Sequence, residues 1–89
     1  MTDLANLKRD AIAALNIVLA TNNADIESGF NGTFDAIHLQ AVSLVTETQT
    51  AIARHLGWLG DDGDPRPDAP DMVATLYDGD ADEKEIMAL

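Results

Sequence analysis

The chain has 89 residues, of which 16 are acidic and 5 basic, giving a formal net charge of -11, and it contains no cysteine. This length allows one small domain. The lack of cysteine excludes a disulfide framework, a thiol enzyme and a Cys-ligated metal site. The excess of acids argues against direct nucleic-acid binding, because Lys and Arg side chains hold the phosphate backbone.

The charge is unevenly distributed. Residues 1–60 carry six acidic and three basic side chains, whereas residues 61–89 carry ten and two. All three prolines fall within residues 61–70. We therefore expect a helical hairpin core at 1–60, an extended, acidic Pro-rich linker at 61–70 and a short helical segment at 71–89.

The first element is predicted as an amphipathic helix over residues 3–20. Thr2 or Asp3 can cap its start. The polar residues 21–23 break the pattern, so residues 21–33 are expected to form a polar connection. Apolar residues recur at three- and four-residue steps, which is the helical period: Leu4, Leu7, Ala11, Ala14, Leu15 and Val18.

A second amphipathic helix of about 23 residues is predicted to follow Thr33. Thr33 is a suitable N-cap, and Gly57 or Gly60 can adopt the left-handed conformation that ends a helix. Two long helices joined by a loop form a helical hairpin. The apolar face contains Phe34, Ile37, Ala41, Leu44, Val45, Ala51, Ile52 and Leu59.

Two short helices are expected in the C-terminal third. Asp68 can cap a helix that is entered through Pro70. Asp80, followed by Glu83 three residues later, predicts a capping box for a last turn. The apolar residues on these elements are Met72, Val73, Leu76 and Tyr77, followed by Ile86, Met87 and Leu89.

The acidic segment around Asp80 matches part of a calcium-binding loop. Asp78, Asp80 and Asp82 have the spacing of the first three ligands. Glu83 stands where the loop needs glycine, and Leu89 stands where it needs a bidentate glutamate. We therefore expect a solvated acidic turn and no metal site.

No catalytic or cofactor-binding pattern is present. His38 and His55 lie seventeen residues apart on one predicted helix, so they cannot share a metal ion. Ser28 and Ser43 are outside any nucleophile motif, and no Gly-rich phosphate loop occurs. The sequence therefore predicts a protein that is not an enzyme and needs no cofactor.

The apolar run at residues 11–20 is too short to span a bilayer and is interrupted by Asn16. No small-residue cleavage site follows it. We therefore expect no membrane association and a cytoplasmic location.

Residues 58–60, Trp-Leu-Gly, resemble the Trp-x-Gly turn of the small secreted helical-hairpin family exported by type VII systems. That resemblance implies a turn near mid-chain and an acid four residues after Tyr77. Here the turn comes at two-thirds of the chain, and Ala81 stands at the acid's position.

The first helix has an apolar sector wider than one partner helix needs, since Ile12, Ile17 and Leu19 lie outside its main stripe. Dimerisation or higher self-association would cover them and complete a bundle. Alternatively, residues 72–77 fold back as a third helix and complete a monomeric core; both can hold at once. The predicted self-association face comprises Leu4, Leu7, Ile12, Leu15, Ile17, Val18, Ile37, Leu44 and Ile52.

The leading hypothesis is a non-enzymatic, all-α protein that acts by self-association and by binding another protein. We expect the partner's surface to be basic, in complement to the net charge. The alternative is an acidic inhibitor that imitates nucleic acid, of the phage anti-defence type. A third possibility is an adaptor whose tail docks into a partner's groove. Candidate partner-binding residues are Met72, Leu76, Tyr77, Asp78, Asp80 and Asp82.

Overall fold

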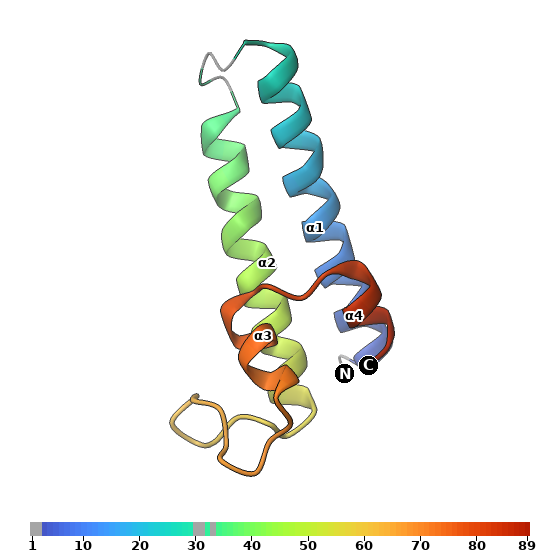
Figure 1. The fold of residues 1–89 in the computed structure, drawn as a ribbon, viewed down its shortest axis with the longest axis vertical. Helices are drawn as coiled ribbons and strands as arrows, with labels where there is room; N and C mark the ends of the chain where they lie inside the picture. The colour runs from blue at the N-terminus through green and yellow to red at the C-terminus, as the bar shows by residue number, and fades with distance from the viewer. Residues whose placement is uncertain (1–2, 30–31, 33) are drawn as a thin grey trace.

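The computed structural model describes residues 3–29, 32 and 34–89. Over these residues all the regular elements are helices: α1 (Leu4–Glu27), α2 (Asp35–His55), α3 (Met72–Asp78) and α4 (Glu83–Met87). The long helices α1 and α2 run antiparallel, while α3 and α4 lie beside the half of the hairpin that holds both termini (Figure 1). The predicted all-α architecture with two long helices is confirmed.

Helix α1 is longer than predicted. It starts at Leu4, where the Asp3 carboxylate accepts a hydrogen bond from the Asn6 backbone N–H at 2.8 Å, so the Asp3 cap is confirmed. The expected end near residue 20 is wrong, because the helix continues to Glu27. Thr21 is buried and donates its hydroxyl proton to the Val18 carbonyl at 3.0 Å. A polar residue there serves the helix interface instead of ending the helix.

Helix α2 ends at His55 with Leu56 as its C-cap, which agrees with the first of the two predicted endings, the one at Gly57. Gly57 has φ 76°, and the N–H groups of Gly57 and Trp58 donate to the carbonyls of Arg54 and Ala53. This is a Schellman ending, which confirms Gly57 as the left-handed residue. At the other end Phe34 occupies the N-cap position without a side-chain cap, and the predicted cap, Thr33, lies outside the described residues.

The acidic segment 61–70 is folded, so the prediction of an extended linker is wrong. The Gly60 N–H donates to the Asp64 carbonyl, and the Arg66 N–H donates to the Trp58 carbonyl, both at 2.8 Å. Leu59 forms an isolated antiparallel bridge with Pro65. The apolar side chains that border the segment pack on the core cluster and hold it there.

The two short helices begin later than predicted. Helix α3 has Asp71 at its N-cap position in place of Asp68. Helix α4 has a capping box made by Asp82 and Glu85, in place of the predicted Asp80 and Glu83. The Glu85 N–H donates to the Asp82 carboxylate at 2.8 Å, and the Asp82 N–H donates to the Glu85 carboxylate at 3.2 Å. The shift of α4 has a physical cause, because the preceding residue, Ala81, uses both of its backbone polar groups in contacts with α2.

That contact is made by Gln49, which is fully buried. Its amide donates to the Ala81 carbonyl and accepts from the Ala81 N–H, each at 2.9 Å. Gly79, two residues before Ala81, also lies close to α2. A Cβ atom at this position would lie 2.8 Å from the Thr46 hydroxyl. The α3–α4 connection is therefore fixed across one face of the hairpin (Figure 1).

The main buried cluster lies in the half of the molecule that α3 and α4 cover. Helix α3 packs on α2 and α4 packs on α1, and the tail thus folds back onto the hairpin. The other half of the hairpin consists of α1 and α2 alone (Figure 1). The buried cluster comprises Ala11, Ile52, Ala53, Leu59, Val73, Leu76, Ala81 and Ile86.

The molecule is a rod with extents of 46 × 23 × 23 Å. Its radius of gyration is 14.4 Å, whereas a compact domain of this length has about 12 Å. The additional length comes from the half of the hairpin that α3 and α4 do not cover.

Candidate interaction surface

The structure divides the predicted self-association residues into three groups. Ile52 is fully buried and offers no surface to a second copy. Val18 is partly buried, as are Leu4, Leu7, Ile12 and Leu15, and these four pack against the core cluster of their own chain. Only Ile17, Ile37 and Leu44 are exposed, with 41, 52 and 40% of their surface accessible.

These three side chains lie together. With Gln40 and Ala41 they line a groove of about 190 Å³ between α1 and α2, which we call the open groove. None of its five described lining residues is ionisable. The predicted face is therefore reduced to a smaller, contiguous and uncharged surface on the uncovered half of the hairpin.

The open groove faces away from α3 and α4. Successive helical residues are separated by 100°, so residues two apart point to nearly opposite sides. On α1, Leu19 borders a hollow shared with the first residues of α4, and Ile17 points the other way. On α2, Thr46 lies against Gly79, and Leu44 points the other way.

A second apolar hollow, of about 240 Å³, lies on the same side as α4. It is lined by Leu15, Asn16, Val18 and Leu19 together with the carboxylate residues Asp82 and Glu83. Leu19 is 60% exposed, more than Ile17, Ile37 or Leu44 in the open groove. The two hollows differ in charge, because Asp82 and Glu83 line the second and no ionisable residue lines the open groove.

Sequence reasoning missed several exposed apolar residues on this half of the hairpin. Ile26, Leu39 and Val42 are 51, 66 and 42% exposed. Their position in the uncovered half could not be derived from periodicity alone, because it depends on where α3 and α4 pack.

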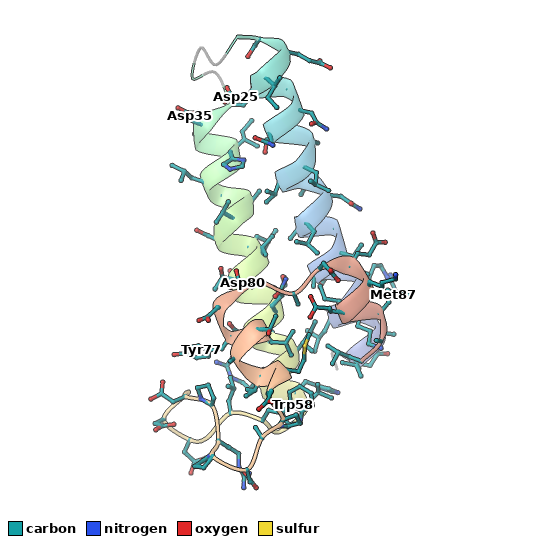
Figure 2. All side chains as sticks on the ribbon, in the orientation of Figure 1. Asp25, Asp35, Trp58, Tyr77, Asp80 and Met87 are labelled. Atoms are coloured by element: carbon teal, nitrogen blue, oxygen red, sulfur yellow. The ribbon has the colours of Figure 1, made fainter. Side chains whose placement is uncertain are left out.

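The predicted partner-binding residues do not form one surface. Leu76 is fully buried and Met72 packs on the core cluster, so neither is available to a partner. Asp82 caps α4. Tyr77, Asp78 and Asp80 are exposed, and Figure 2 places Tyr77 and Asp80 on the C-terminal third, beside the lower half of the hairpin.

Tyr77 is held by the folded acidic segment. Its hydroxyl donates to the Asp64 carboxylate at 3.2 Å. This hydrogen bond, together with the negative charge of Asp64, raises the pKa of Tyr77 above its ordinary value of about 10. The contact ties α3 to the acidic segment at the surface.

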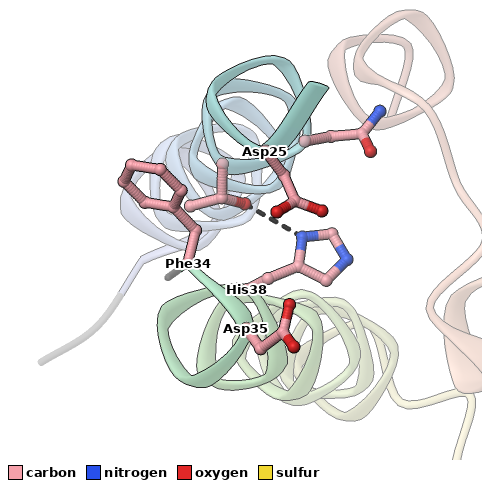
Figure 3. Close-up of a pocket in the computed structure, with 6 residues that line it drawn as sticks. Asp25, Phe34, Asp35 and His38 are labelled. Carbon is pink, nitrogen blue, oxygen red and sulfur yellow. Dashed lines mark hydrogen bonds between the residues drawn. The ribbon is translucent and has the colours of Figure 1, made fainter. Parts of the chain in front are cut away.

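A polar cluster lies at the tip of the hairpin (Figure 3). The Thr21 hydroxyl lies 2.9 Å from His38 Nδ1 and 3.0 Å from the Val18 carbonyl, so it joins α1 to α2 through a hydrogen bond with the imidazole. Asp25 Oδ1 is buried and accepts no hydrogen bond from the described part of the chain. The adjoining cavity, about 50 Å³, is large enough for a water molecule that would satisfy it.

Within residues 3–29, 32 and 34–89, no three or more His, Asp or Glu side chains are grouped to hold a metal ion. In the same part of the chain, no helix combines the length and the apolarity needed to cross a membrane. Comparison with known proteins finds no matching family model, no matching curated protein and no matching solved structure.

Proposed function

We propose that this protein is a non-enzymatic, cytoplasmic helical protein that acts through protein–protein contact, and that the open groove is the surface by which it associates with a second copy of itself. One observation carries the proposal: three exposed large aliphatic side chains, Ile17, Ile37 and Leu44, line a groove without an ionisable residue. Contiguous exposed apolar surface is typical of interaction sites, and here it lies on a chain with a net charge of -11.

The surface area of the chain supports a partner of its own size. The chain exposes 5738 Å², whereas a compact monomer of its mass exposes about 5,000 Å². The excess of roughly 700 Å² is close to the surface, about 800 Å², that each protein contributes to a standard interface. Covering the three side chains would stabilise the complex by about 1 kcal/mol for each.

The test is a matched pair of charge substitutions on α1. Ile17→Asp places a carboxylate in the open groove, whereas Leu19→Asp makes the same change two residues away on the opposite side. Light scattering coupled to size exclusion should give a dimer for wild type and Leu19→Asp and a monomer for Ile17→Asp, because a desolvated, unpaired charge is costly. Circular dichroism checks that both variants keep their helices. A monomeric wild type, or dissociation by Leu19→Asp alone, contradicts the proposal.

A second candidate function is an acidic inhibitor that imitates nucleic acid. One observation favours it: the acidic segment 61–70 is held by backbone hydrogen bonds, so the backbone that carries its carboxylates follows a defined path. A basic partner would be attracted over long range. In a competition assay with duplex DNA and a basic DNA-binding protein, displacement of the DNA should be strong at low salt and weaken as salt screens the charges. No displacement at low salt excludes this function.

A further inference from the structure

We infer that the two copies pair antiparallel across the open groove, with their acidic C-terminal thirds at opposite ends of the dimer. This inference rests on the proposed self-association and adds its orientation. It follows from where the structure places the charge relative to the groove.

The charge is separated from the groove in two ways. Residues 61–89 carry ten acids and two bases, and they pack on the half of the hairpin that holds both termini (Figure 1). They also cross the other face of the hairpin, where the hollow beside Leu19 is bordered by Asp82 and Glu83. The open groove therefore lies on the side away from Asp82 and Glu83, and Glu47 lies beside it, in a neighbouring hollow that shares Gln40 and Leu44.

The same placement selects the orientation. A parallel pair would bring the two acidic thirds, each with a net charge of -8, side by side. An antiparallel pair places them at opposite ends of a rod pair whose single members are 46 Å long. Placing the two acidic thirds at opposite ends of such a pair separates them by more than the Debye length, which is about 10 Å at 0.1 M salt, so the repulsion is screened.

An antiparallel pair has a two-fold axis that crosses the groove near its middle, and Gln40 is exposed there on α2. Ala51 is eleven residues further along α2, which is three turns and about 16 Å, on the same side of the helix. Residue 40 of one copy then lies near residue 40 of the other copy, whereas the two residues 51 are about 30 Å apart.

Because the chain has no cysteine, single-cysteine variants test this directly. Gln40→Cys and Ala51→Cys are made in the full-length chain and treated with a short bismaleimide cross-linker. We expect a covalent dimer from Gln40→Cys and none from Ala51→Cys. Sedimentation of both untreated variants records whether they associate.

Each other outcome has one meaning. Cross-linking at both positions indicates a parallel pair, which overturns the orientation and leaves the proposed function standing. A dimer that cross-links at neither position places the interface on another face and overturns the inference. A chain that stays monomeric and cross-links nowhere contradicts the proposed function itself.

Discussion

The pairing of Gln49 with Ala81 should be the principal polar contact that holds the C-terminal third on the hairpin. Gln49→Leu keeps nearly the same volume but removes both hydrogen bonds, leaving the Ala81 N–H and carbonyl without partners in the interior. Each buried, unpaired backbone group costs about 1–3 kcal/mol. Allowing for the gain from an apolar side chain, we expect a loss of about 2–4 kcal/mol in the free energy of unfolding.

The assay is urea unfolding followed by circular dichroism, at one fixed chain concentration because association adds a concentration-dependent term. Gln49→Glu provides a second measurement. Its ionised carboxylate can accept from the Ala81 N–H but cannot donate to the carbonyl, so the variant should be unstable at neutral pH. The protonated carboxyl group can both accept from the Ala81 N–H and donate to the Ala81 carbonyl. The stability of Gln49→Glu relative to wild type should therefore rise as the pH falls through the pKa of this carboxyl group. A Gln49→Leu variant within about 0.5 kcal/mol of wild type would refute the reasoning.

Three further predictions concern the same half of the molecule. Gly79→Ala should lower the free energy of unfolding by about 2 kcal/mol, because a Cβ would meet Thr46 at 2.8 Å and the backbone has φ 76°. Gly63→Ala, where φ is 84° but no atom lies within 4 Å of the Cβ, should lose only the smaller part that comes from the backbone conformation. Equal losses in the two variants would contradict the clash with Thr46. Asp82→Ala should cost about 1 kcal/mol, with Asp80→Ala close to neutral, and the reverse order would favour the cap predicted from sequence. The single tyrosine should titrate above about pH 10 by absorbance, and Asp64→Asn should lower its pKa.

The tyrosine prediction also fixes a pH dependence. The pKa of Tyr77 is raised in the folded chain, so the stabilisation it provides is complete below the pKa of the unfolded chain. It is lost as the pH rises from about 10 through the higher, folded-state pKa, because the unfolded chain releases the proton first. An unchanged pKa in Asp64→Asn would exclude Asp64 as the cause.

Periodicity and capping chemistry predicted the two long helices, the Asp3 cap and the ending at Gly57, because these depend on residues within one turn of each other. The predictions that failed depend on contacts between distant segments. Thr21 reads as a helix breaker but is buried against α2. The shift of the last cap to Asp82 depends on Gln49, thirty-two residues before Ala81.

The candidate surface could be predicted only in part for the same reason. The sequence places Ile17, Ile37 and Leu44 on apolar stripes along with Leu4, Leu7 and Ile52. Which of these remain exposed depends on where the C-terminal third packs. Gln49 is fully buried in the structure, and its contact with Ala81 shows where the distant segment meets α2.

The central claim is that a second copy of the chain covers the open groove, and sedimentation equilibrium of the unmodified protein tests it most directly. The mass of one chain is 9.5 kDa. As the concentration rises through the micromolar range, the account predicts that the weight-average mass approaches twice that value. A mass that stays at that of a single chain at every concentration would contradict it.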